Sequence, residues 1–174
     1  MNISVMTNSR NDLFNLLKGD QNIGIELGVA KGLYSKAMVD SNKFYKVYGI
    51  DRYGDHHDTK EYIDALKYVG LDKPYILIRS FFEEALDLFS DNYFDFIYID
   101  GYAHSGQEKG KTFEQWFSKL KIGGIFAGHD YHSKWPLTVK HVDEFVKENN
   151  LVLNKTLEEN NEKNHLYPSW YLLK

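Results

Sequence analysis

The sequence contains no cysteine, which excludes disulfide bonds, thiolate zinc sites and a cysteine nucleophile together. No run of roughly 18 apolar residues occurs, so no segment reads as a membrane-spanning helix. The start, MNISVMTNSRNDLFN, lacks the basic segment and apolar core of a secretory signal. We therefore expect a soluble, cytoplasmic protein that makes no membrane contact.

An excess of positive charge is also missing. The chain has 21 Lys and Arg against 25 Asp and Glu, a net charge of -4, which provides no overall attraction to phosphate backbones. A nucleic acid partner is therefore disfavoured, although the composition does not exclude a local basic patch. The length of 174 residues fits one domain, residues 1–174, and leaves the oligomeric state undetermined.

Apolar segments typical of buried strands alternate with segments of helical periodicity along the whole chain. The predicted strands are 23–27, 46–51, 75–80, 94–100 and 123–130. The predicted helices are 9–18, 33–40, 59–69, 82–89, 113–120 and 138–149, and two β-leaning runs, 151–157 and 169–173, follow as an antiparallel pair. This alternation predicts an α/β fold with a doubly wound, mostly parallel seven-stranded sheet.

Four acids stand at the ends of predicted strands: Glu26, Asp51, Asp100 and Asp130. In doubly wound sheets ligands bind outside the carboxyl ends of the strands, so these positions are the first candidates for function. Carboxylates on one edge repel each other unless a cation or hydrogen-bond donors separate them. Packing alone is therefore a poor explanation for these acids.

The first predicted strand leads into a glycine-containing loop, IELGVAKG. Gly28 and Gly32 allow tight turns and a close approach of the backbone to a ligand. Ala30 stands where a dinucleotide fingerprint has its middle glycine, and the Lys-Ser/Thr pair of a phosphate loop is absent. An acid here, Glu26, suits a ligand with a cationic amino end, and Asp51 can accept both hydroxyls of a ribose.

The segments IELGVAKG, YGID, FDFIYIDGYAH and LKIGGIFAGHDY follow one another at four predicted strand ends. Together they resemble the successive motifs of the class I S-adenosylmethionine-dependent methyltransferases, in particular the small O-methyltransferase-like group. The resemblance spans residues 21–149. It implies a Rossmann-like fold and transfer of a methyl group from S-adenosylmethionine to an acceptor, with a hydroxyl of a small molecule or sugar as the leading candidate.

The resemblance also implies roles for individual residues in cofactor binding. Glu26, Gly28 and Gly32 would hold the methionine part, and Asp51 the ribose. Residues near the adenine would be Arg52, Ser80 and Phe81. Asp100 is a candidate both for catalysis and for cofactor binding, where it would orient the cofactor loop if no metal is bound. The alternatives are a purely structural glycine turn, Asp51 as a cap or loop residue, and a phenylalanine that belongs to the core.

The ends of the fourth and fifth predicted strands carry the candidates for chemistry. Asp100, His129 and Asp130 could hold Mg²⁺ or a similar cation that polarises a substrate hydroxyl. Metal-dependent relatives carry two adjacent acids in the loop after the fifth strand, whereas a histidine at one of these positions shifts the preference away from hard cations. The alternative is that His129 and Asp130 only hold the backbone at the strand end.

His104, four residues after Asp100, is the candidate general base, since neutral imidazole accepts a proton near pH 7. The alternative is that His104 is a surface or hydrogen-bonded histidine. The acceptor proton would then leave through a metal, Tyr102 or water. His132 and Trp135 are expected to line the substrate entrance, where Trp135 could stack on a flat acceptor or simply pack.

Three functions compete. A methyltransferase leads, and a cofactor-binding module without catalysis is the alternative, because a fold alone does not imply activity. A nicotinamide oxidoreductase is disfavoured by Ala30 and Glu26. Amino methylation of nucleic acid is disfavoured because DGYA stands where its N/D-P-P-Y/F motif is expected.

Overall fold

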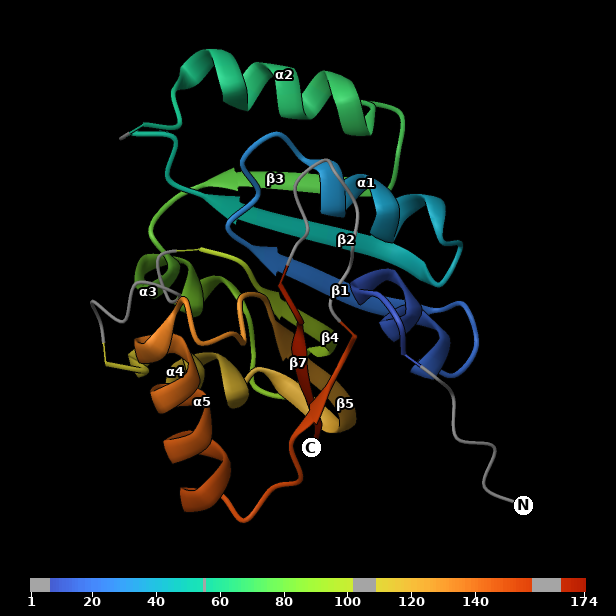
Figure 1. Cartoon of the computed structure of the whole chain (residues 1–174). Coiled ribbons are helices and arrows are strands. Elements are labelled where there is room, and N and C mark those ends of the chain that lie inside the picture. The colour runs from blue at the N-terminus through green and yellow to red at the C-terminus, as the bar shows by residue number, and fades with distance from the viewer. Residues whose placement is uncertain (1–6, 55, 102–108, 158–166) are drawn as a thin grey trace.

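A computed structural model describes residues 7–54, 56–101, 109–157 and 167–174. Its centre is a seven-stranded sheet in the order β3-β2-β1-β4-β5-β7-β6 (Figure 1). The strands are β1 (Asn22–Leu27), β2 (Phe44–Asp51), β3 (Tyr75–Arg79), β4 (Phe94–Ile99), β5 (Leu120–Gly128), β6 (Asn154–Lys155) and β7 (Trp170–Leu173). The first five run parallel, whereas β7 is antiparallel to both β5 and β6.

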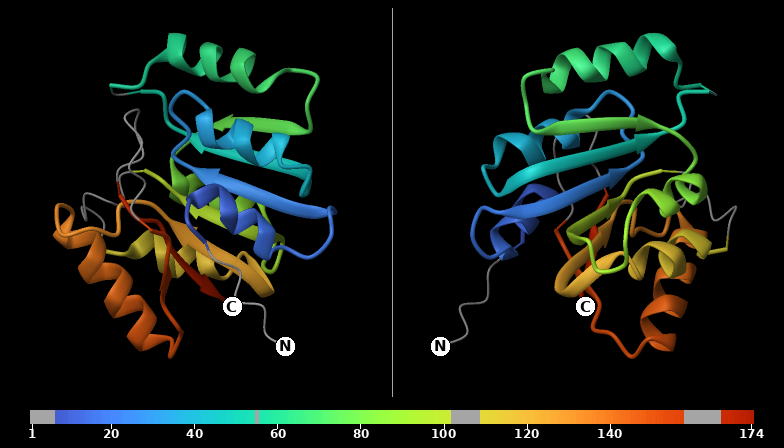
Figure 2. Two further views of the ribbon diagram at one scale, coloured as in Figure 1. Left: turned by 45° about the vertical axis from the view of Figure 1, so that its right-hand side comes forward. Right: turned by 180° about the vertical axis from the view of Figure 1, so that it is seen from behind.

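Helices cover both faces of the sheet, as the two views in Figure 2 show. They are η1 (Arg10–Leu16), α1 (Leu33–Asp40), α2 (Thr59–Val69), α3 (Phe82–Ala85), η2 (Leu86–Leu88), α4 (Lys111–Phe117) and α5 (Pro136–Glu148), where η marks a 3-10 helix. One core cluster joins η1 and α1 to Phe96 and Tyr98 of β4, and another joins α3, α4 and α5 to Ile97 and Ile99. Successive residues of β4 therefore bury side chains on opposite faces of the sheet.

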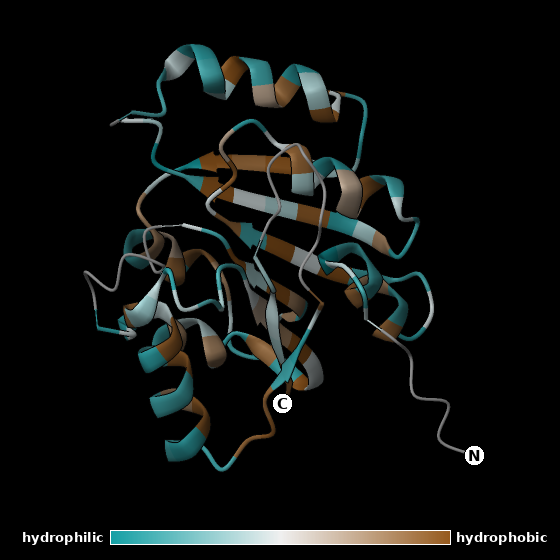
Figure 3. Ribbon diagram, viewed as in Figure 1, coloured by the Kyte–Doolittle hydropathy of each residue, from teal (hydrophilic) through white to brown (hydrophobic). Residues whose placement is uncertain are grey.

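Hydrophobicity explains this layering. The strands carry most of the apolar colour in Figure 3, and every residue of β1 is buried. In α2 and α5 the apolar residues gather on one face of the helix and the polar residues on the other, so each helix buries its apolar face against the rest of the protein. In α2 the buried positions are Ala65 and Val69, one turn apart.

The predicted doubly wound, mostly parallel fold with antiparallel strands at its end is confirmed. Local details differ from the prediction: the strand predicted at 151–157 is two residues long, and the helix predicted at 82–89 is a short α-helix followed by a 3-10 helix. The segment 9–18 forms a 3-10 helix of seven residues, whose capping box joins Ser9 and Asp12. The fifth strand begins at Leu120, three residues earlier than predicted, because Gly123 (φ +80°) lies within an irregular stretch of the strand where the register shifts.

Strand order reverses between β1 and β4, since β2 and β3 continue outward on one side and β5 on the other. In such sheets this switch point is where the loops diverge and leave room for a ligand at the carboxyl ends. The candidate site is therefore centred on the loops that follow β1 and β4. No helix among the described residues is long and apolar enough to cross a membrane.

Candidate functional site

Glu26 lies in β1, one residue before the strand ends, with only 2% of its surface exposed. Its carboxylate accepts a hydrogen bond from the Ser35 hydroxyl of α1. Burial raises the pKa of Glu26 to about 8, and the negative charge of Asp100 acts in the same direction, whereas the Ser35 bond and Arg10 oppose the rise. Near neutral pH this acid is therefore mostly protonated until a positive charge comes beside it.

Gly28 brings the loop after β1 against the end of β4. It adopts φ +95°, and a Cβ added here would stand 2.0 Å from the carbonyl oxygen of Asp100. Its amide donates to the Ile50 carbonyl at 2.8 Å, and the Asp100 amide donates to the Leu27 carbonyl at 2.7 Å. The close approach that requires glycine is thus to the chain itself, at the switch point.

Gly32 begins α1 with φ +77°. A Cβ at this position would meet a methyl group of Val69 at 3.2 Å and the Cβ of Ala65 at 3.4 Å. Ala30 also adopts a left-handed conformation, with φ 47°. The loop is therefore tightly wound, and Gly32 lets α1 approach α2 closely.

Asp51, the last residue of β2, binds backbone amides of two loops. Its Oδ2 accepts hydrogen bonds from the amides of Val29 and Ala30, both at 2.9 Å, and its Oδ1 accepts from the Tyr53 amide at 3.1 Å. The residue is 8% exposed. A carboxylate offers about four acceptor positions, so these bonds leave about one for a ligand.

Tyr53 is a member of this arrangement that the sequence analysis missed. Its side chain is fully buried, and its hydroxyl donates to the Ala30 carbonyl at 2.7 Å. Asp51 and Tyr53 together hold Ala30 by both its amide and its carbonyl. The glycine loop is thus fixed from the β2 side before any ligand binds.

The three residues predicted near the adenine come together at the ends of β2 and β3. The guanidinium carbon of Arg52 lies 4.6 Å from the centre of the Phe81 ring. Ser80 donates its amide to the Asp51 carbonyl at 3.1 Å and its hydroxyl to Glu84 at 3.4 Å. Arg52 is exposed and Phe81 half-buried, so this pair offers a flat surface at the edge of the site.

Asp100 follows β4 directly, and its partner is Arg10 of η1, which the sequence analysis did not identify. Arg10 Nη1 lies 3.0 Å from Asp100 Oδ2, with the two side chains 7% and 23% exposed. The guanidinium stands 4.5 Å from the centre of the Tyr34 ring, and the Tyr34 hydroxyl donates to the Arg10 carbonyl at 3.0 Å. A buried positive charge is therefore fixed beside Asp100 and near Glu26.

His129 and Asp130 follow β5. His129 Nε2 is 3.5 Å from Asp130 Oδ1, and its Nδ1 is 3.4 Å from the hydroxyl of Tyr98. Asp130 is 7% exposed and has φ 60°. Among the described residues, no three His, Cys, Asp or Glu side chains form a group that could hold a metal ion. The divalent cation predicted at Asp100, His129 and Asp130 therefore stays a prediction, without a ligand set in the described part of the chain.

The predicted general base, His104, and its alternative, Tyr102, lie outside the described residues. Their roles stay predictions. Of the predicted entrance residues, His132 packs its ring against Tyr167, with centres 4.8 Å apart, and Trp135 lies edge-on to the same ring at 6.4 Å.

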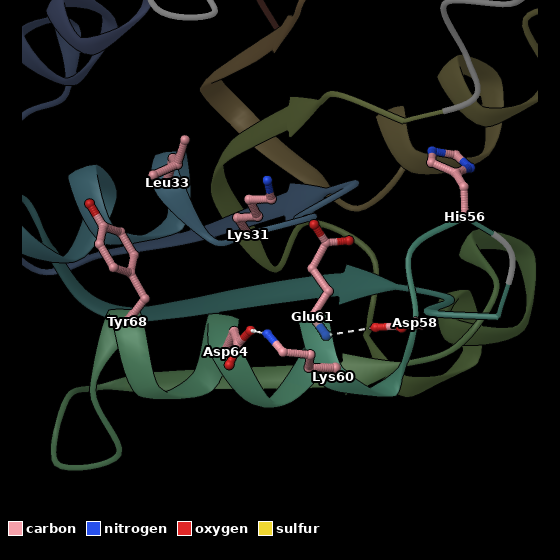
Figure 4. A pocket seen from close by; sticks show the side chains of 8 residues that line it. All are labelled: Lys31, Leu33, His56, Asp58, Lys60, Glu61, Asp64 and Tyr68. Atoms are coloured by element: carbon pink, nitrogen blue, oxygen red, sulfur yellow. Dashed lines mark hydrogen bonds and ion pairs between the residues drawn. The ribbon is translucent and has the colours of Figure 1, made fainter.

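A cavity of about 440 Å³ lies beside the glycine loop, between the start of α1 and α2 (Figure 4). Its lining has both signs of charge, and Figure 4 shows Lys31 and Glu61 pointing toward one another across it. Lys60 pairs with Asp64, and Asp58 accepts from the Glu61 amide at 2.9 Å as the cap of α2. None of these residues belongs to the predicted site, and their charges are largely balanced within the helix.

A doubly wound sheet with a glycine loop and acids at its switch point is the architecture of the class I S-adenosylmethionine-dependent methyltransferases. The chain matches the family described as "Methyltransferase domain" over residues 23–131, and it belongs to this family. No curated protein matches the chain.

Solved structures share this fold along nearly the whole chain. An rRNA methylase from Streptococcus thermophilus is 16% identical, with a TM-score of 0.67 over 94% of this chain and 93% of that one. A precorrin-6y C5,15-methyltransferase from Geobacter metallireducens is 16% identical, with a TM-score of 0.67 over 92% and 86%. An O-methyltransferase from Bacillus cereus, in complex with S-adenosylhomocysteine (SAH), is 13% identical, with a TM-score of 0.67 over 88% and 74%. At identities of 13–16%, these structural similarities show that the fold is shared and nothing beyond it.

Proposed function

We propose that this protein transfers a methyl group from S-adenosylmethionine to a hydroxyl of a small molecule. The main supporting observation is the set of acids around the glycine loop. They lie at the carboxyl ends of β1, β2 and β4 and are Glu26, Asp51 and Asp100. Membership of a methyltransferase domain family supports this proposal. So does the SAH bound to the Bacillus cereus O-methyltransferase of the same fold.

The residues fit the two ends of such a cofactor. A buried acid whose pKa is raised, Glu26, is a suitable partner for a cationic amino group, because the incoming charge stabilises the carboxylate. The buried guanidinium of Arg10 supplies the opposite charge for the carboxylate of the methionine end. The Arg52–Phe81 pair offers a surface on which an adenine can lie, with Asp51 next to it for the ribose.

When bound, S-adenosylmethionine supplies a methyl group on a positively charged sulfur, which an oxygen nucleophile can attack in line. The task of the protein is then positioning and removal of the hydroxyl proton. The fixed loop of residues 28–32 provides the positioning, because Asp51 and Tyr53 hold its backbone. His104 is our candidate for accepting the proton.

The test is calorimetry with SAH, followed by methyl transfer from S-adenosylmethionine to a panel of phenols, alcohols, sugars and amines, with products identified by mass spectrometry. We expect binding of SAH and a methyl ether as product. Binding without transfer to any acceptor would favour the cofactor-binding module. An N-methylated product, or transfer to RNA alone, would exclude the hydroxyl acceptor. Absence of SAH binding would refute the proposed function as a whole.

A further inference from the structure

A second cavity of about 440 Å³ lies beyond the end of β5, where that strand leads into α5. Tyr131, His132 and Ser133 form one wall, and Lys155 and Pro168 form another. The Tyr131 amide donates to the Pro168 carbonyl at 2.9 Å, which holds the two walls together. The cavity is distinct from the residues that we assign to the cofactor.

The described lining of this cavity includes a basic side chain, and the nearby Asp143 carboxylate is bonded to the Tyr131 hydroxyl. Lys155 lines it, and no acidic side chain is among its described lining residues. Lys134, next to Ser133 in the sequence, donates to the Tyr167 hydroxyl at 2.8 Å, and the Tyr167 ring packs on that of the lining residue His132 with centres 4.8 Å apart. The cavity beside α2, in contrast, is lined by three acids, Asp58, Glu61 and Asp64, together with two lysines. A basic side chain with no acid among the described lining residues, in a chain of net charge -4, favours an anionic ligand.

The walls are flat as well as charged. The ammonium of Lys155 stands 5.1 Å from the centre of the Tyr131 ring, and the Tyr131 hydroxyl donates to Asp143 at 2.6 Å. This bond fixes the ring and directs its polar atom toward α5. Two proline rings, of Pro136 and Pro168, complete the lining with apolar surface. Such walls suit a ring system better than a flexible chain.

The position relates the cavity to the methyl acceptor. Ile99 pairs with Gly128 across β4 and β5, so Asp100 and His129 follow on neighbouring strands. Neighbouring strands lie about 4.8 Å apart, and each residue spans at most about 3.8 Å, so Tyr131, two residues after His129, lies within about 12 Å of Asp100. That span matches the length of a small substituted ring compound. One end of an acceptor can therefore lie near Asp100 while its other end occupies the cavity.

We propose that this cavity binds the anionic end, a phosphate or carboxylate, of a cyclic hydroxy compound that is the methyl acceptor. The inference rests on the proposed function, because only a methyltransferase has a methyl acceptor. Lys155 is the specificity-determining residue: its ammonium pairs with the anion above the Tyr131 ring.

The test uses the full chain saturated with SAH and three probes of similar ring size: phenyl phosphate, benzoate and uncharged benzyl alcohol. We expect at least one anion to bind about tenfold or more tightly than benzyl alcohol, with an affinity that falls as salt rises. Lys155→Gln should lower that affinity about five- to twentyfold, and Lys155→Arg should restore most of it. Lys147→Gln, at the far end of α5, is the matched control and should change nothing. The better-bound anion identifies the group as a phosphate or a carboxylate.

Three results would overturn the inference. One is equal binding of the charged and uncharged probes, and another is an anion affinity that Lys155→Gln leaves unchanged. The third is Lys155-dependent binding of a short single-stranded RNA together with no binding of the small anions, which would assign the cavity to a nucleic acid acceptor. SAH affinity, measured in the same titrations, separates the two proposals. If SAH binds and the anions do not, only the cavity inference fails.

Discussion

Arg10 and Asp100, ninety positions apart in the sequence, form an ion pair of 3.0 Å at the switch point of the sheet. Arg10 comes from a short 3-10 helix before the first strand, and Asp100 from the end of β4. The pair ties the N-terminal segment to the site that we assign to the cofactor. The positive charge of Arg10 also lowers the pKa of the nearby buried acid Glu26, which opposes the effect of the Asp100 charge.

Arg10→Gln should lower the free energy of unfolding by about 2–3 kcal/mol, since removing one partner of a buried pair leaves the other charge uncompensated. The expected loss lies below the roughly 3–5 kcal/mol typical of fully buried pairs because the Asp100 side chain is 23% exposed. Urea denaturation measures it. Lys36→Gln breaks an exposed pair with Asp40 and serves as the control, at about 0–1 kcal/mol.

The same variant tests the role of Arg10 toward the cofactor. SAH affinity should fall about tenfold or more, whereas 5′-methylthioadenosine, which lacks the amino acid end, should bind Arg10→Gln as well as it binds the wild type. An equal loss for both ligands would mean that Arg10 only supports the fold.

The affinity for SAH should depend on pH through Glu26. Burial raises the pKa of this carboxyl to about 8, so a cationic amino group that binds beside it must displace a proton. Affinity should therefore rise by up to about tenfold per pH unit below pH 8, and should fall above it as the α-amino group of the ligand, with a pKa of about 8, loses its charge. Calorimetry in two buffers of different ionisation enthalpy counts the released proton. Glu26→Gln should lack the rising limb, and a flat profile in the wild type would exclude this role.

Glu26 should also reduce the stability of the protein without ligand. The pKa of Glu26 is higher in the folded chain than in the unfolded one, so the folded state binds more protons between about pH 4.5 and 8. The stability that the protonated group contributes is complete below pH 4.5 and is lost as the pH rises to 8. Glu26→Gln, which cannot ionise, should thus be more stable than the wild type by about 1–3 kcal/mol at pH 8. The two proteins should converge at pH 5, and a constant difference would indicate packing instead of ionisation.

Gly28→Ala should destabilise the protein by about 3 kcal/mol or more, because the new methyl group would collide with the Asp100 carbonyl and φ +95° is strained for alanine. Gly19→Ala is the matched control. Gly19 has φ +67° with no atom within 4 Å of the added Cβ, so it measures the conformational cost alone, about 1 kcal/mol. Equal losses in urea denaturation would show that the contact with β4 is relaxed in solution.

Much of the fold was predictable because buried parallel strands are continuous apolar runs and connect through helices. The start of β5 was not, since a glycine pair looks alike in a turn and in an irregular part of a strand. In the site, Arg52 and Phe81, both predicted near the adenine, lie side by side, and their role toward the cofactor stays a prediction. Arg10 could not be found, because its burial depends on Tyr34 and Asp100, which no local pattern connects to it.

Gly28 and Asp51 show a further limit. Their sequence pattern predicts ligand contacts for both residues, whereas each also has a structural role that depends on long-range contacts. Gly28 faces the Asp100 carbonyl, and Asp51 binds the amides of Val29 and Ala30. A pattern typical of ligand binding can thus also be required to build the loop that binds the ligand.

The two roles of Asp51 can be separated. Asp51→Ala leaves the amides of Val29, Ala30 and Tyr53 without their acceptor, so hydrogen exchange at these amides should accelerate. SAH affinity should fall about 10–100-fold. Asp58→Ala is the control: it removes the cap of α2 and should cost about 1 kcal/mol of stability while leaving SAH affinity unchanged.

A 2′-deoxy analogue of SAH then tests whether the remaining acceptor position of Asp51 binds the ribose. The wild type should bind the analogue about tenfold more weakly than SAH, because one hydrogen bond to a charged group is lost. Asp51→Ala should bind both ligands equally, since it has no carboxylate left to tell them apart. If the wild type already binds the two ligands equally, Asp51 acts through the loop alone, and the ribose must be held by other groups at the end of β2.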